Sequence, residues 1–137
     1  MITPDHQELI DAARPLLHNM ILGRPDWDAA SVAAAIRSKS GKIYTGVCIH
    51  LSCGLGFCAE HAAGAEMIKG GETQIDTIVA VADDCLLTPC GRCREFLLQI
   101  DPRNADATVI LDGDRLVKLR DLMPEHWLTC DSHSQSP

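Results

Sequence analysis

Two cysteine motifs constrain the fold of this chain more than any other feature, because each stands between a strand-like segment and a helix-like one. Cys58-Ala59-Glu60 follows a strand-like segment and opens a helical pattern that ends near Gly70. Pro89-Cys90-Gly91-Arg92-Cys93 follows an expected strand at 75–82, which contains the apolar run 78–82, and opens a second helical pattern. Residues that follow the strands of such a sheet gather at one rim. We therefore expect the three cysteines to meet at one point.

The remaining pattern predicts a chain of alternating strands and helices. Helical spacing over 5–22 predicts a first helix with Asp5 as its N-cap and Gly23 as its stop. The other expected elements are a hairpin of strands 31–37 and 42–50, a helix with Thr88 as N-cap and Pro89 as first residue, strands 108–111 and 115–119, and a short helix at 119–123. The central order of strand, helix, strand, helix and strand predicts a parallel sheet core with helices on its faces.

The three cysteines predict a zinc ion bound by Cys58, Cys90 and Cys93. A catalytic zinc site has three protein ligands and a fourth position for water. Glu60, two residues after the first cysteine, is expected to lie beside the metal without binding it. Its expected role is to take the proton of the water and return it to the substrate.

Three thiolates on Zn²⁺ leave a net negative charge, which opposes ionisation of the water. The N-termini of the two helices offset part of this charge. His61, Arg92 and Arg94 are near enough in sequence to donate hydrogen bonds to the sulfur atoms as outer partners.

Two other interpretations of the motifs exist. A purely structural zinc needs a fourth ligand, for which Cys53, Cys85, His50 and His61 are candidates. The Cys-x-x-Cys pair could instead be a redox pair. Glu60 favours the catalytic interpretation. An odd total of seven cysteines argues against a disulfide framework, so the cysteines outside the motifs (Cys48, Cys53, Cys85 and Cys130) are interpreted as small apolar residues or free thiols.

Composition and net charge exclude some classes of protein and ligand. The chain of 137 residues is 46% hydrophobic, which predicts one domain over 1–130 and a disordered polar tail at 131–137. No signal-peptide pattern and no membrane span is evident, so a cytoplasmic location is expected. The net charge of −7 argues against nucleic-acid binding and favours a small, weakly charged substrate.

The two motifs resemble the signatures of the cytidine deaminase superfamily. The cysteine at position 58 resembles the small all-cysteine zinc branch, which includes cytidine and blasticidin-S deaminases. Val32–Arg37 with Gly41 is similar to the first hairpin of that family, and Leu122-Met123-Pro124 to its C-terminal motif. The resemblance implies a three-layer α/β/α sandwich with a mixed five-stranded sheet. It also implies hydrolytic release of ammonia and a homotetramer.

Residue by residue, the resemblance implies that the three motif cysteines bind zinc and that Glu60 carries the proton. It further implies that the Ala59 backbone and the Pro89 turn shape the pocket for the base. Cys48 and His50 stand where nucleoside-specific members have the Asn and Glu that bind the ribose. The aromatic residue expected just before Val32 is missing, and the nearest one is Trp27.

The predicted function is hydrolytic deamination of a cytosine-type ring by zinc-bound hydroxide, with a nucleoside-like small molecule as substrate. Cytidine and a modified relative such as blasticidin S are both candidates. The alternative is a non-catalytic, zinc-stabilised nucleoside-binding module.

Overall fold

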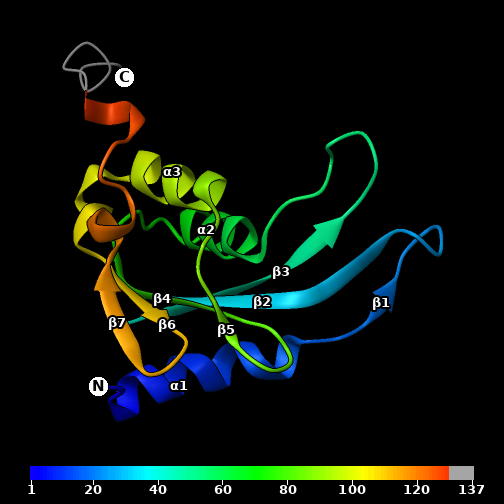
Figure 1. Ribbon diagram of the computed structural model, residues 1–137, viewed down its shortest axis with the longest axis horizontal. Helices are drawn as coiled ribbons and strands as arrows, with labels where there is room; N and C mark the ends of the chain where they lie inside the picture. The colour runs from blue at the N-terminus through cyan, green and yellow to red at the C-terminus, as the bar shows by residue number, and fades with distance from the viewer. Residues whose placement is uncertain (130–137) are drawn as a thin grey trace.

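The computed structural model describes residues 1–129 and shows helices on both faces of one sheet (Figure 1). The expected tail at 131–137 and Cys130 lie outside the described residues. The helices are α1 (Pro4–Ala13), α2 (Ala59–Lys69) and α3 (Gly91–Ile100), and four short 3-10 turns cover Arg14–Leu16, Pro102–Asp106, Leu119–Leu122 and Trp127–Thr129. The strands are β1 (Met20–Ile21), β2 (Asp28–Ser38), β3 (Ile43–His50), β4 (Ile75–Val81), β5 (Leu86–Leu87), β6 (Thr108–Leu111) and β7 (Arg115–Lys118).

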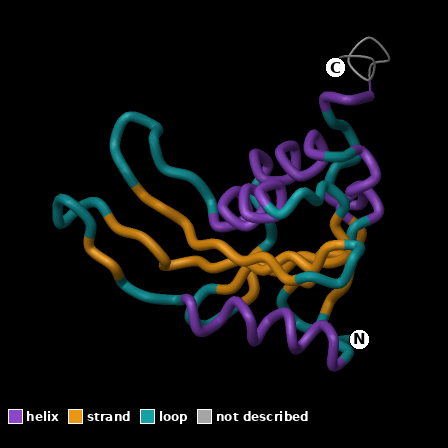
Figure 2. Tube along the Cα trace, turned by 180° about the vertical axis from the view of Figure 1, so that it is seen from behind, coloured by secondary structure: helices purple, strands orange, loops and turns teal. Residues whose placement is uncertain are grey.

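Five longer strands form the body of the sheet in the order β3-β2-β4-β6-β7. The two-residue strands β1 and β5 add to β2 and β4. Strand β2 is antiparallel to both of its long neighbours, whereas β4 and β6 are parallel. Helix α1 covers one face and α2 and α3 cover the other, as the view from behind also shows (Figure 2). The predicted α/β/α sandwich with a mixed five-stranded sheet is therefore confirmed.

The parallel core expected from the alternation of strands and helices is wrong in one respect. Strand β2 lies between β3 and β4, so the connection through α2 passes over an antiparallel strand. The residues Ala33, Ala34 and Ala35 of β2 are fully buried and pair on both sides, which suits a central strand. Strands β3 and β4 still run in the same direction, because each is antiparallel to β2.

The first helix is shorter than expected. Thr3, not Asp5, is its N-cap, and the Thr3 hydroxyl accepts a hydrogen bond from the backbone N–H of His6. The helix ends at Ala13 because Pro15 has no N–H to continue it. Residues expected at its end instead form β1, which pairs with β2.

Two apolar clusters hold the layers together, one on each face of the sheet. On one face, Ile36 of the sheet packs in a cluster with Met67 of α2 and Leu97 of α3, and on the other face Val79 of the sheet packs in a cluster with Leu9 of α1. Within residues 1–129, no helix is both long and apolar enough to span a bilayer.

Gly46 of β3 permits the close approach of α2. A Cβ atom at Gly46 would lie 2.4 Å from the backbone nitrogen of Ala63, which is closer than real Cβ contacts. This approach fixes the start of α2 against the sheet, and the first cysteine motif stands at that start.

Candidate active site

The three motif thiols meet between the starts of α2 and α3. Cys58 is the N-cap residue of α2 and Cys90 that of α3, and neither side chain caps its own helix by a hydrogen bond. Their Sγ atoms lie 3.7 Å apart, and the Sγ atoms of Cys90 and Cys93 lie 3.4 Å apart. Two segments far apart in sequence thus place three sulfur atoms together, as the positions of the motifs predict.

The spacing of the sulfur atoms fits a zinc ion. Tetrahedral coordination with Zn–S distances of about 2.3 Å places sulfur atoms about 3.8 Å apart. Burial raises the pKa of Cys58 and of Cys93, and the nearby Glu60 carboxylate raises that of Cys93 further. Thiolates packed this closely repel one another, so a bound cation would stabilise the ionised form.

The thiol cluster has three ligands and no fourth protein ligand in the described chain. Within residues 1–129, these three thiols are the only group of three or more His, Cys, Asp or Glu ligating atoms that all lie within 4.8 Å of one another. The candidates for a closed structural site (Cys53, Cys85, His50 and His61) are not part of the cluster. A three-ligand arrangement is the one that catalytic zinc sites use.

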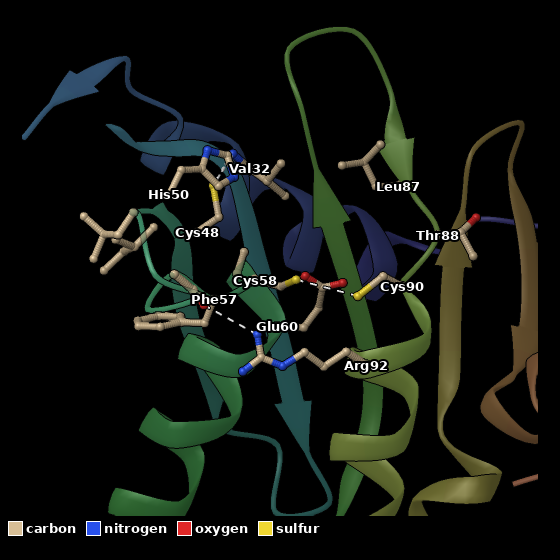
Figure 3. A pocket seen from close by; sticks show the side chains of 15 residues that line it. Val32, Cys48, His50, Phe57, Cys58, Glu60, Leu87, Thr88, Cys90 and Arg92 are labelled. Atoms are coloured by element: carbon tan, nitrogen blue, oxygen red, sulfur yellow. Dashed lines mark hydrogen bonds between the residues drawn. The ribbon is translucent and has the colours of Figure 1, made fainter. Parts of the chain in front are cut away.

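Glu60 is almost fully buried, with 5% of its surface exposed, on the first turn of α2. Burial raises the pKa of its carboxyl group, because a charge is costly in an apolar surrounding. Its side chain is seen next to those of Cys58 and Cys90, and all three line the same pocket (Figure 3). A group that holds a proton more readily than a solvated carboxylate is suited to move one back and forth.

His61 is held against the thiol cluster from α2. Its Nδ1 lies 3.5 Å from the Sγ of Cys93, and its ring stacks on Phe96 with centroids 4.2 Å apart. Burial and the charge of Arg92 lower the pKa of His61, which favours the neutral ring. A neutral ring can donate one N–H to a sulfur atom, the outer contact that the sequence predicts for His61.

The two arginines donate their hydrogen bonds to backbone carbonyl groups and not to the sulfur atoms in the described part of the chain. Arg94 donates from Nε to the carbonyl of Pro89 at 2.7 Å and from Nη1 to that of Leu122 at 2.8 Å. Arg92 donates to the carbonyl of Gly56 at 3.5 Å. The expectation that Arg92 and Arg94 hydrogen-bond the sulfurs is therefore wrong. Their hydrogen bonds go to carbonyl groups instead, and those of Arg94 join the turn before α3 to Leu122.

A pocket of about 430 Å³ opens beside the thiols (Figure 3). Cys58, Ala59, Glu60 and Cys90 form one side of it. Its volume falls in the range of small-molecule sites, ~300–1,000 Å³. The pocket therefore places Cys58, Cys90 and Glu60 where a bound small molecule can reach them.

Of the predicted substrate-binding residues, Ala59, Cys48 and His50 line this pocket and Pro89 does not. Helix α3 begins at Gly91, with Cys90 as its N-cap, and not at Pro89 as expected. Residues 86–87 before this turn form β5, which the sequence pattern did not reveal. The neighbouring Thr88 lines the pocket instead.

Sequence reasoning missed several pocket residues, which are mostly apolar or glycine: Val32, Ile49, Leu51, Gly54, Gly56, Phe57, Leu87 and Thr88. Phe57 was detectable, because it directly precedes the first cysteine motif. Trp27, the aromatic residue considered from the sequence, donates a hydrogen bond to the Ser52 hydroxyl at 2.8 Å and is not among the lining residues.

Comparison with known proteins identifies the family. No protein-family model matches the chain. A blasticidin-S deaminase of Bacillus cereus is 35% identical over 106 residues, which cover 68% of this chain and 74% of the relative. The chain belongs to the cytidine deaminase superfamily. This agrees with the sequence resemblance, and the three-thiol cluster fits the zinc branch of the superfamily.

Solved structures support the same assignment. The cytidine deaminase of Mycobacterium tuberculosis has a TM-score of 0.75 and 26% identity, and the match covers 91% of this chain and 98% of that one. The cytidine deaminase of Bacillus anthracis has a TM-score of 0.71 and 26% identity, over 94% and 93% of the two chains. The predicted enzyme class, an aminohydrolase of the cytidine deaminase type, is thereby confirmed.

Proposed function

We propose that this chain is a zinc-dependent hydrolytic deaminase that acts on a cytosine-type ring. The observation that carries the proposal is the buried carboxyl of Glu60 beside three thiols at zinc-like spacing, with Glu60, Cys58 and Cys90 lining one pocket. Bound by Cys58, Cys90 and Cys93, zinc supplies a Lewis acid that makes a water molecule acidic near neutral pH. The relatives named for cytidine and blasticidin S support a cytosine-type substrate.

Glu60 is proposed to manage the protons of the reaction. As a carboxylate it accepts a proton from the attacking water and passes it to a ring nitrogen. The oxygen bonds to the carbon that bears the amino group, the C–N bond breaks, and the second proton leaves with ammonia through Glu60. The ring keeps a carbonyl in place of the amine. A positioned acid/base of this kind contributes about 10²–10⁴-fold to the rate.

Release of ammonia tests the proposal directly. Zinc-loaded protein is incubated with cytosine, cytidine, blasticidin S and adenosine, with and without a chelator. Ammonia released from a cytosine compound and suppressed by the chelator supports the proposal. Binding of the same compounds without any ammonia would instead show a non-catalytic nucleoside-binding module.

Cytidine itself is expected to be a poor substrate. The positions predicted to contact the ribose hold Cys48 and His50, and both line the pocket. The Cys48 thiol is buried and already accepts a hydrogen bond from the backbone N–H of Val32 at 3.3 Å. A site without its hydroxyl partners loses much of its discrimination. We expect kcat/KM for cytidine below about 10⁵ M⁻¹s⁻¹, and a higher value for a cytosine compound with a larger appendage. Steady-state kinetics showing efficient cytidine turnover would contradict this.

We also propose a homotetramer. Apolar side chains remain exposed on β1 and α2, among them Ile21 at 60% and Ile68 at 48%. Burial of such side chains between subunits is favourable. Light scattering at micromolar concentration should give the mass of four chains, and a monomer mass would refute the proposal.

A further inference from the structure

Arg94, on the first turn of α3, binds three backbone carbonyl groups from two separate segments of the chain. Its side chain donates from Nε to the carbonyl of Pro89 at 2.7 Å and from Nη1 to that of Leu122 at 2.8 Å. Its backbone N–H donates to the carbonyl of Cys90 at 3.0 Å. Arg94 is not among the residues that line the pocket, so it does not meet a bound ligand directly.

The hydrogen bond to Pro89 fixes the direction in which the chain enters α3. The pyrrolidine ring sets the φ angle of Pro89, which leaves ψ as the one soft backbone torsion of this residue. Rotation about ψ moves the carbonyl oxygen of Pro89 together with the nitrogen and Cα of Cys90, because the peptide group between the two residues is planar. A guanidinium group that holds this oxygen therefore holds the backbone of Cys90 as well.

The position of Cys90 is more critical than that of an ordinary N-cap residue. Its backbone is extended, and its side chain makes no capping hydrogen bond with α3. Its Sγ atom lies 3.7 Å from that of Cys58, which stands at the start of a different helix. The ligand distances of a metal site hold to within about 0.2 Å. A small rotation of the Pro89–Cys90 peptide would therefore move Cys90 out of reach of an ion that it shares with Cys58.

Leu122 gives the side chain of Arg94 a fixed point on its other side. Leu122 ends the 3-10 turn Leu119–Leu122, and the next residue, Met123, is buried in the same apolar cluster as Leu97 of α3. A guanidinium group is planar and presents its N–H groups in a rigid fork, so one side chain can hold both carbonyls at once. The turn before α3 is thereby tied to a segment that the core already holds in place.

We propose that Arg94 is a positioning residue for Cys90, the proposed zinc ligand. It sets the Pro89–Cys90 peptide against the carbonyl of Leu122 and so keeps the three thiols at the spacing that zinc needs. This role depends on the geometry of the guanidinium group and not on its positive charge, so it differs from charge compensation at the sulfur atoms. The inference rests on the proposed function for the presence of zinc.

Zinc affinity tests the inference without turnover. The full chain is stripped of metal and titrated with Zn²⁺ in competition with a chromophoric chelator. Arg94→Ala should bind zinc about 10- to 100-fold more weakly than the parent, which is the usual effect of removing an outer partner of a metal ligand. With Co²⁺ in place of zinc, the visible absorption of the variant should differ from that of the parent, because these bands report the coordination geometry.

Arg94→Lys separates position from charge. Lysine keeps the positive charge, but a single ammonium group on a flexible stem does not hold two carbonyls in a fixed geometry. Arg94→Lys should therefore bind zinc nearly as weakly as Arg94→Ala. Parental zinc affinity in Arg94→Lys would overturn the inference, because charge alone would then be sufficient.

Arg37→Ala is the matched control for a general loss of stability. Arg37 is also a partly buried arginine, with 14% of its side chain exposed, and it donates to the backbone carbonyl of Asp5 and to the carboxylate of Glu8. These contacts tie α1 to β2, away from the residues that line the pocket. Arg37→Ala should melt at a lower temperature and keep the zinc affinity and the Co²⁺ spectrum of the parent.

Parental zinc affinity in Arg94→Ala would overturn the inference, as would an equal loss of affinity in Arg37→Ala. If Arg94→Ala does not fold, Arg94→Lys carries the test, and failure of both variants to fold in excess zinc would overturn the inference by assigning Arg94 to the fold as a whole. The proposed function is judged separately by ammonia release. Deamination by the parent with unchanged zinc affinity in Arg94→Ala refutes only the inference, whereas a parent that binds no zinc refutes both.

Discussion

Replacement of Glu60 by Gln should leave the fold and the zinc content intact and lower kcat by about 10²–10⁴-fold. Gln has nearly the shape of Glu but cannot carry the proton. The site should also tolerate a neutral side chain, because the carboxyl group of Glu60 is buried and that burial raises its pKa. A neutral amide at this position removes the cost of burying a charge, so stability should not fall.

The measurement compares ammonia release, zinc content and melting temperature for Glu60→Gln and the parent on a substrate that the parent accepts. Glu66→Gln is the matched control. Glu66 lies on the same helix, is exposed, and accepts a hydrogen bond from the backbone N–H of Thr45, which an amide oxygen can also accept. A wild-type rate in Glu60→Gln would exclude the acid/base role.

The spacing of apolar residues predicted most of the helices and strands, because that spacing depends on the local backbone conformation. The strand 108–111 and the helix after Cys58 were placed within a residue, since each is bounded by a clear change of pattern. The pairing of strands was not predictable in the same way. The alternation of strands and helices indicates crossovers, but it does not say that β2 stands between β3 and β4.

The thiol cluster was predictable and the rest of the pocket was not, for a physical reason. The ligand spacing of a metal site is set by short motifs at the ends of elements, so a sequence reveals it. The other residues that line the pocket, such as Val32, Phe57 and Leu87, come from several separate segments of the chain and carry no short motif. The hydrogen-bond partner of His50 is also non-local, because Asp28 meets it only through the register of two strands.

Arg92 and Arg94 show that closeness in sequence does not predict which side chains contact each other in the fold. Arg94 lies next to Cys93 in sequence, yet its guanidinium points to the carbonyls of Pro89 and Leu122. A helix turns by about 100° per residue, so neighbours in sequence face different directions. Closeness in sequence therefore did not identify which basic group reaches a sulfur, whereas His61 reaches Cys93 from the other helix.

Replacement of Cys90 by Ala should abolish zinc binding and, with it, activity. Cys90 is the sulfur that approaches both others, at 3.7 Å from Cys58 and 3.4 Å from Cys93. Without it, two thiols remain, and two ligands do not make the three-ligand site that catalytic zinc uses. Metal analysis should find about one zinc per parent chain and almost none in the variant.

Stability provides a second measurement of the same change. A metal that binds the folded state alone raises the melting temperature with its concentration. The parent should therefore melt higher with zinc than with a chelator, and Cys90→Ala should melt at the same temperature in both. Cys85→Ala is the control, because Cys85 lies outside the thiol cluster and outside the residues that line the pocket. Full zinc retention by Cys90→Ala would refute the ligand assignment, and without that assignment the start of α3 would have no role in the proposed chemistry.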